Sequence, residues 1–156
     1  MNKLQELRKI LIERGLNISV AESCTGGMLA QHLTKYPGSS SYFDRGFITY
    51  TNQSKIDELG VNSSVIDAFG AVSLEVASEM VKGINKKSKT SISIAITGIA
   101  GPGGASIGKP VGTVCFGFIV NGELFAEKKL FSGDRELIVQ SSVNFALEYI
   151  FSQIKI

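Results

Sequence analysis

Two kinds of hydrophobic periodicity alternate along this chain, and their order limits the folds that it can adopt. Some segments carry apolar residues three or four positions apart, as amphipathic helices do: residues 3–14, 26–36, 52–59, 63–69, 73–84 and the segment after 134. Between them lie shorter runs typical of β-strands, at 17–21, 43–50, 91–97, 111–120 and 123–131. Helices that alternate with strands predict an α/β protein, and we expect a three-layer α/β/α sandwich.

The strands are expected to form one mixed, mostly parallel sheet. Residues 91–97 read SISIAIT and contain no charged side chain, which favours a central strand covered on both faces. Asn121 and Gly122 predict a tight hairpin, so the strands on either side of them pair antiparallel. In sheets of this kind, functional residues usually follow the carboxyl ends of the strands.

Length and composition narrow the class of protein further. A chain of 156 residues fits a single domain, which we assign to residues 1–156. The net charge of +2 and the 8% aromatic content argue against a nucleic-acid-binding protein. One histidine and two cysteines are too few for a zinc site of nitrogen and sulfur ligands, and we predict no metal and no cofactor. The N-terminal segment does not read as a signal peptide and no apolar run reaches the roughly 18 residues of a membrane span, so we expect a cytoplasmic protein that contacts no membrane.

Three clusters of small residues follow predicted strands, at 23–27, 98–110 and 132–134. Backbone N–H groups exposed in such turns bind anions, although the same clusters also fit plain tight turns. The second cluster contains the spacing G-x-x-x-x-G-K of a phosphate-binding loop, but Pro110 stands where that motif needs Ser or Thr. The dinucleotide-binding fingerprint fails as well, because Ser106 stands where its last glycine belongs.

Ser23 is the strongest candidate for a nucleophile. It leaves a predicted strand and enters a helix, so its side chain is presented at a sharp turn beside the N–H groups of Gly26 and Gly27, which can stabilise an oxyanion. A plain helix-capping role is the alternative for Ser23. Cys24 is a rival nucleophile, but the one imidazole of the chain, that of His32, lies roughly 10 Å further along the same helix. A catalytic pair with this histidine is therefore not expected.

Without a nearby histidine, the base for Ser23 has to be a lysine or a carboxylate. Lys55 lies in the first turns of a short helix that follows Tyr50, and the dipole of that helix disfavours a cation there. Burial or nearby positive charge would lower the pKa of Lys55, as a neutral lysine base requires. An ordinary solvated surface lysine is the alternative, and Glu22, which adjoins Ser23, is the next candidate base.

Six motifs spread over nearly the whole chain occur together in one known family. They are AESCTGG (21–27), PGSSSYFDRGFITYTNQSK (37–55), GAVS (70–73), TGIAGPGG (97–104), KPVGTV (109–114) and FSGDR (131–135). On these motifs the chain resembles the CinA C-terminal domain family. The resemblance implies a cytoplasmic α/β/α protein that forms a homodimer or higher homo-oligomer. Stand-alone members are nicotinamide-nucleotide amidohydrolases, which convert nicotinamide mononucleotide to nicotinic acid mononucleotide and ammonia without a metal.

The resemblance also implies roles for individual residues. The serine nucleophile, lysine base and assisting tyrosine of the family match Ser23, Lys55 and Tyr50. Its supporting threonine and arginine match Thr97 and Arg135. Together with the glycine clusters, these matches give the predicted substrate-binding residues: Thr25, Gly26, Gly27, Thr97, Gly98, Gly101 and Arg135.

One position departs from the family pattern. Many members carry a second arginine four residues after Arg135, where this chain has Val139, so phosphate contacts beyond Arg135 are in doubt.

The resemblance implies an acyl-transfer reaction. We expect Lys55 to take the proton of Ser23, which then attacks the carboxamide and forms an acyl-enzyme that water hydrolyses. One alternative is a non-catalytic nucleotide-binding module associated with competence or with the DNA-damage response. Another is a structural subunit in which Ser23 and Lys55 are idle.

Overall fold

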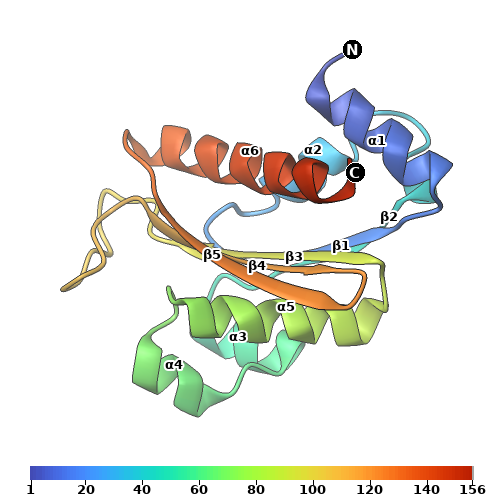
Figure 1. The fold of residues 1–156 in the computed structure, drawn as a ribbon. Helices are drawn as coiled ribbons and strands as arrows, with labels where there is room; N and C mark the ends of the chain where they lie inside the picture. The colour runs from blue at the N-terminus through green and yellow to red at the C-terminus, as the bar shows by residue number, and fades with distance from the viewer. Residues whose placement is uncertain (156) are drawn as a thin grey trace.

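A five-stranded sheet forms the centre of the computed structural model, which describes residues 1–155 (Figure 1). Along the sheet the strands follow the order β2, β1, β3, β4, β5. Their bounds are β1 (Ile18–Glu22), β2 (Phe43–Ile48), β3 (Ile92–Gly98), β4 (Thr113–Val120) and β5 (Glu123–Leu130). Strand β1 is parallel to β2 and β3, whereas β4 is antiparallel to β3 and β5, so four of the five strands point the same way. The predicted mixed, mostly parallel sheet is confirmed.

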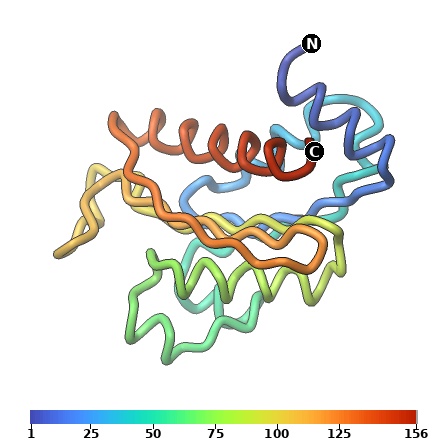
Figure 2. The backbone as a smooth tube through the Cα atoms, viewed as in Figure 1, coloured from blue at the N-terminus to red at the C-terminus, as the bar shows by residue number. Residues whose placement is uncertain are grey.

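Helices cover both faces of this sheet, as Figures 1 and 2 show. One face carries α1 (Lys3–Glu13), α2 (Met28–Leu33) and α6 (Arg135–Ile154). The other face carries α3 (Asn52–Leu59), α4 (Ser63–Phe69) and α5 (Leu74–Ser88). A 3-10 turn, η1 (Ser39–Ser41), precedes β2. The predicted three-layer α/β/α arrangement is therefore confirmed. Among residues 1–155, no helix is both long and apolar enough to span a bilayer.

Two hydrophobic clusters fill the spaces between the sheet and its helices. On the α6 face, Phe118 of β4 stacks on Tyr149 of α6 with ring centroids 4.0 Å apart. On the α5 face, Met80 and its apolar neighbours on that helix pack against Ala95 of β3. Every residue of β3 from Ile92 to Thr97 is buried, as expected for a central strand covered on both sides.

Helix α5 approaches both the sheet and α3 closely at two glycines. A Cβ atom at Gly117 of β4 would lie 2.4 Å from the carbonyl oxygen of Ala77. A Cβ atom at Gly83 of α5 would lie 2.0 Å from the carbonyl oxygen of Leu59, the last residue of α3. Neither contact leaves room for a side chain, so these glycines allow α5 to pack closely against both β4 and α3. This packing holds α3, which carries Lys55, in place.

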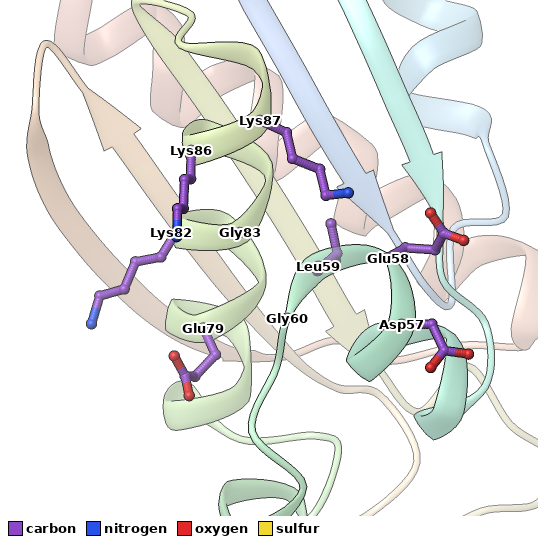
Figure 3. Close-up of a pocket in the computed structure, with 9 residues that line it drawn as sticks. All are labelled: Asp57, Glu58, Leu59, Gly60, Glu79, Lys82, Gly83, Lys86 and Lys87. Atoms are coloured by element: carbon purple, nitrogen blue, oxygen red, sulfur yellow. The ribbon is translucent and has the colours of Figure 1, made fainter.

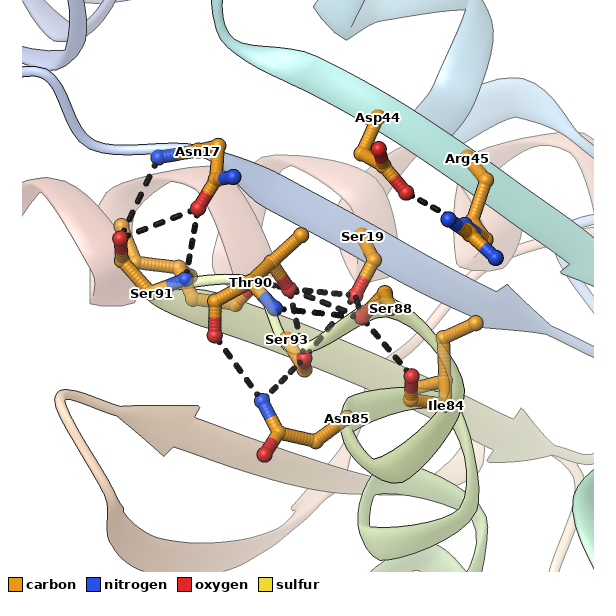
Figure 4. A network of polar contacts seen from close by, with 11 residues as sticks. Asn17, Ser19, Asp44, Arg45, Ile84, Asn85, Ser88, Thr90, Ser91 and Ser93 are labelled. Carbon is orange, nitrogen blue, oxygen red and sulfur yellow. Dashed lines mark hydrogen bonds and ion pairs between the residues drawn. The ribbon is translucent and has the colours of Figure 1, made fainter.

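A network of hydroxyl groups joins the amino ends of β1 and β3 to the end of α5 (Figure 4). The Ser19 hydroxyl lies 2.9 Å from that of Ser88, 2.8 Å from that of Thr90 and 2.9 Å from that of Ser93. The side-chain amide of Asn85 donates to the Ser93 hydroxyl at 2.9 Å. Because these buried and half-buried groups bond one another, the network adds specific contacts at the end of the strands opposite Ser23.

Helix α2 is shorter than the predicted range 26–36. It begins at Met28 because Gly26 and Gly27 have φ angles of 58° and 105°, which a right-handed helix does not accommodate. The predicted capping of this helix by Thr25 is wrong, because the cap position is Gly27 and no side chain of that residue is present to bond the helix. The Thr25 hydroxyl instead donates to Glu22.

Other boundaries also differ from the prediction by a few residues, among them the ends of α5 and β2. Helix α5 continues to Ser88 rather than ending near 84, because its last turn is polar and gives no apolar periodicity. Strand β2 ends at Ile48, so Tyr50 lies in the loop before α3 and not at the end of a strand.

Candidate active site

Ser23 lies where the parallel strands β1, β2 and β3 end. Its N–H donates to the Ile96 carbonyl of β3 at 3.0 Å, and the N–H of Thr49, just after β2, donates to the Glu22 carbonyl at 2.8 Å. The sheet thus fixes the backbone on both sides of the last β1 residue. The Ser23 side chain follows directly, and only 7% of the residue is exposed.

Lys55 reaches Ser23 from α3. A reciprocal capping box between Thr51 and Ser54 starts this helix and places Lys55 at its fourth position. The Lys55 Nζ lies 3.0 Å from the Ser23 Oγ and 2.8 Å from the carbonyl oxygen of Thr49. Because Lys55 is 1% exposed, the alternative of a solvated surface lysine is wrong.

The surroundings of Lys55 favour its neutral form. Burial lowers the pKa of the Lys55 ammonium below its ordinary value of 10.5, and the nearby Cys24 thiol opposes this to a lesser extent. Among residues 1–155, no carboxylate lies within ion-pair distance of Lys55. Burial, as predicted, is the cause of the lowered pKa, and no effect of Arg135 adds to it. A neutral amine at this position has a lone pair for the Ser23 proton and an N–H for the Thr49 carbonyl.

Glu22 and Cys24, which flank Ser23, are both buried and have other roles. The two carboxylate oxygens of Glu22 accept hydrogen bonds from the Thr25 hydroxyl and from two N–H groups of α2. Glu22 is therefore poorly placed as the alternative base. Burial raises the pKa of the Cys24 thiol to about 12, which disfavours the thiolate that a cysteine nucleophile requires.

His32 does not take part in the site. Its Nδ1 lies 2.8 Å from the Met28 carbonyl oxygen on the same helix, α2. The imidazole borders a cavity with Leu7 of α1 and Leu147 of α6, near the opposite end of α2 from Ser23. Within residues 1–155, no hydrogen bond joins His32 to Ser23 or to Cys24.

The backbone of the turn offers some of the predicted oxyanion donors. The N–H of Gly26 donates to the Ser23 carbonyl at 3.1 Å, so it is not free as the sequence predicted. For the N–H groups of Thr25 and Gly27, no hydrogen-bond partner is found within residues 1–155. The same holds for the N–H of Cys24, so the donors left for a bound oxyanion are those of Cys24, Thr25 and Gly27.

Tyr50, Gly101 and Arg135, from three distant parts of the chain, meet through Arg135. Its Nη2 donates to the Tyr50 hydroxyl at 2.6 Å, and its Nη1 donates to the Gly101 carbonyl at 2.8 Å. Tyr50 is 55% exposed, so this group forms an open, cationic rim. Two of the five guanidinium N–H donors are used in these bonds, and among the described residues the other three have no partner and can bind an anion.

Thr97 and Gly98, two predicted substrate-binding residues, lie beneath the site. The Thr97 side chain is buried, and its hydroxyl donates to the Ala71 carbonyl at 2.9 Å. A Cβ atom at Gly98 would lie 3.0 Å from the Cys24 sulfur, so a glycine allows β3 to pack against the turn that carries Ser23. The structure thus gives both residues a supporting position.

A groove of about 610 Å³ lies apart from these residues, between the end of α3 and α5 (Figure 3). Its walls carry both signs of charge, from Asp57, Glu58, Glu79, Lys82, Lys86 and Lys87. None of the predicted site residues lines it. Within residues 1–155, no group of three or more His, Cys, Asp or Glu side chains is arranged to hold a metal ion.

Comparison with known proteins connects this geometry to a family. The sequence model described as "CinA C-terminal domain" matches residues 2–154. A competence-damage inducible protein of Clostridium botulinum (strain Langeland) is 46% identical over 149 residues, which are 96% of this chain and 36% of that protein. A protein of the same name from Clostridium beijerinckii is 48% identical over 138 residues, 88% of this chain and 34% of its own length. The chain spans about a third of the length of these relatives.

Solved structures agree with the sequence comparison. A competence-damaged protein (CinA) superfamily protein from Escherichia coli superposes with a TM-score of 0.92 at 37% identity, over 96% of this chain and 87% of that one. The competence/damage inducible protein CihA from Agrobacterium tumefaciens superposes with a TM-score of 0.89 at 40% identity, over 97% of this chain and 96% of that one.

Proposed function

Because the chain belongs to the CinA C-terminal domain family, we propose that it is a serine amidohydrolase that converts nicotinamide mononucleotide to nicotinic acid mononucleotide and ammonia. The observation that supports this function best is the contact between the buried Lys55 Nζ and the Ser23 Oγ at 3.0 Å. A lysine with a lowered pKa beside a serine hydroxyl is one pair that supports nucleophilic catalysis without histidine.

The first half of the reaction forms an acyl-enzyme. The neutral Lys55 amine takes the Ser23 proton as the Oγ attacks the carboxamide carbon, and the carbonyl oxygen becomes an oxyanion. The N–H groups of Thr25 and Gly27 are the donors proposed for this oxyanion. The new Lys55 ammonium donates to the Thr49 carbonyl, which already lies 2.8 Å from Nζ.

The carbon–nitrogen bond then breaks as the leaving nitrogen takes a proton from Lys55. Ammonia departs, an ester to Ser23 remains, and Lys55 is neutral again. Lys55 next takes a proton from water as the water oxygen attacks the ester carbon. The bond between this carbon and the Ser23 Oγ then breaks, Lys55 returns the proton to Oγ, and the product leaves as a carboxylate after its acid proton passes to solvent. Tyr50, at the rim of the site, is proposed to assist these proton transfers.

The rim of the site fits the remainder of such a substrate. Arg135 retains three N–H donors for a phosphate, which a planar guanidinium binds well. Ile48 and Tyr50 are 57% and 55% exposed, and they offer apolar surface for a pyridine ring. A mononucleotide needs both kinds of contact, an anion site and an aromatic site, beside the reacting carboxamide.

An ammonia-release assay tests this function. The purified protein should release ammonia and nicotinic acid mononucleotide in equal amounts from nicotinamide mononucleotide. The Ser23→Ala variant should keep its thermal unfolding temperature and most of its ligand affinity, yet lose at least about a hundredfold in rate, because only the nucleophile is removed. A wild-type protein that binds the nucleotide but releases no ammonia would instead fit the alternative of a nucleotide-binding module.

A further inference from the structure

Glu22 is a buried carboxylate with no cationic side chain beside it. It is the last residue of β1, and 1% of it is exposed. Within residues 1–155, it forms no ion pair. A carboxylate taken out of water is costly unless hydrogen bonds replace its hydration. Three hydrogen bonds that the Glu22 carboxylate accepts offset this cost.

All three donors come from the residues that follow Ser23. The Thr25 hydroxyl donates to Oε1 at 2.6 Å, and the Leu29 N–H donates to the same oxygen at 2.9 Å. The Ala30 N–H donates to Oε2 at 3.0 Å. Leu29 and Ala30 are the second and third residues of α2, whose N–H groups a capping side chain normally binds. Glu22 thus caps α2 from outside the helix, and its negative charge lies at the positive end of the dipole.

Residues 23–27, which we call the nucleophile turn, need such a fixed point. The turn ends in Gly26 and Gly27, with φ angles of 58° and 105°, and Gly27 has no side chain to cap the helix. Two consecutive glycines have wide conformational freedom. The carboxylate of Glu22 spans the turn, because it lies before Ser23 and bonds Thr25 within the turn and α2 beyond it.

We propose that Glu22 is a positioning residue for the reaction, an inference that rests on the function proposed above. By closing the nucleophile turn onto α2, its carboxylate holds the Ser23 Oγ at 3.0 Å from the Lys55 Nζ and keeps the N–H groups of Thr25 and Gly27 in a fixed place. No hydrogen bond joins the Glu22 carboxylate to the Ser23 hydroxyl or to Lys55 among the described residues. Glu22 therefore acts through the turn and not on the reacting atoms.

The Glu22→Gln variant tests this role. Glutamine has the same shape but one acceptor oxygen, so at least one of the three donors loses its partner. We expect kcat to fall about ten- to a hundredfold, as for a slightly misplaced nucleophile, with KM changed less than about threefold. Thr25→Val should lower kcat in the same way. Thr25→Ser, which keeps the hydroxyl, should have a kcat close to that of the wild type.

A matched control separates positioning from stability. Asn2 caps α1 through a bond to the Gln5 N–H, far from Ser23 in the sequence, so Asn2→Ala removes a helix cap without touching the turn. Asn2→Ala should lower the unfolding temperature and leave kcat of the folded protein unchanged. If Glu22→Gln and Thr25→Val keep the wild-type kcat, or if Thr25→Ser fails to restore it, the positioning role is wrong.

Two further measurements do not depend on turnover. Amide hydrogen exchange at Leu29 and Ala30 should be faster in Glu22→Gln than in the wild type. A fluorophosphonate reagent should label Ser23 of the wild type, and label it more slowly in Glu22→Gln. If the wild type releases no ammonia but labels at Ser23 as described, the proposed substrate fails and the positioning role stands. Equal labelling of both proteins, or none of the wild type, would overturn the role of Glu22.

Discussion

Lys55 is buried in a place that does little to stabilise its charge. The polar atoms within hydrogen-bond distance of its Nζ are the Ser23 hydroxyl and the Thr49 carbonyl oxygen, both uncharged groups. Each unit by which burial lowers the pKa corresponds to about 1.4 kcal/mol in favour of the neutral amine. The neutral amine is the form that can accept the Ser23 proton, so the burial of this one side chain is central to the proposed chemistry.

The rate of hydrolysis should follow the titration of Lys55. We expect kcat/KM to rise with pH through an apparent pKa below the ordinary 10.5, because only the neutral amine acts as the base. Lys55→Arg should be as inactive as Lys55→Ala, since a guanidinium keeps its proton throughout this range. Rates measured from pH 6 to about pH 10 test both statements. An active Lys55→Arg variant would mean that Lys55 contributes only positive charge.

The burial of Lys55 could be predicted from its spacing to an apolar residue on the same helix, although not from composition. Lys55 precedes Leu59 by four residues, so both lie on the same face of α3, and both are buried. A lysine in line with a core leucine on a short helix is therefore a candidate buried base. The capping role of Glu22 left no such signal, because its partners lie seven and eight residues further along the chain. Local spacing rules do not reach that far.

At the scale of elements, the position of α3 depends on its contact with α5. The two helices approach each other closely at Gly83, where a Cβ atom would lie 2.0 Å from the Leu59 carbonyl oxygen. Since the obstacle is backbone, no side-chain rotation can relieve it. Any shift of α3 away from α5 also shifts Lys55 relative to Ser23. The geometry of the site thus depends on the packing of Leu59 of α3 against Gly83 of α5.

Gly83→Ala should therefore affect both stability and activity. We expect a loss of about 1–3 kcal/mol in the free energy of unfolding, as for an overpacked core, together with a lower kcat at temperatures where the protein remains folded. Gly103→Ala is the matched control, because Gly103 has no positive φ angle and a Cβ atom there would meet no other atom within 4 Å. It should change the free energy of unfolding by less than about 0.5 kcal/mol. Urea titrations and kcat values at one temperature compare the two, and equal effects would contradict this account.

Most elements could be predicted because their signals are local. The uncharged run of β3, the Asn121–Gly122 hairpin and the apolar repeat of α6 each specify an element without help from distant residues. Helix α2 could not be placed correctly, because its start depends on positive φ angles at Gly26 and Gly27 and on a carboxylate supplied by β1. Elements whose ends depend on tertiary contacts are those that a local pattern misplaces.

At the scale of the whole molecule, the strand order brings the site together. Ser23 follows β1, Thr49 follows β2 and Thr97 lies one residue before the end of β3, and these three neighbouring parallel strands finish at the same edge of the sheet. The meeting of Arg135 with Tyr50 and Gly101 depends on how α6 crosses the sheet, which periodicity does not specify. Membership of the family pointed to these residues, and their contacts with one another emerged only from the fold.

The buried lysine should also lower the stability of the whole molecule. In the unfolded chain Lys55 titrates near 10.5, whereas in the folded protein burial lowers its pKa. Between these two pKa values the unfolded chain binds a proton that the folded protein has released, so the contribution of Lys55 to stability rises with pH across this window. The destabilising effect of Lys55 is therefore absent above about pH 10.5. It grows as the pH falls and reaches its full size once the pH is below the folded-state pKa.

Lys55→Met should therefore be inactive yet more stable than the wild type at pH 7, by about 1.4 kcal/mol for each unit by which the folded-state pKa is lowered. The gain should shrink as the pH approaches 10.5, since both forms of the wild-type protein then carry a neutral amine. Lys82→Met is the control, because Lys82 is exposed on α5 and should change stability by less than about 0.5 kcal/mol at either pH. Urea unfolding at pH 7 and pH 9.5 measures all three proteins. If Lys55→Met proves less stable than the wild type at pH 7, the hydrogen bonds of Lys55 outweigh its burial, and the neutral base inferred from that burial loses its support.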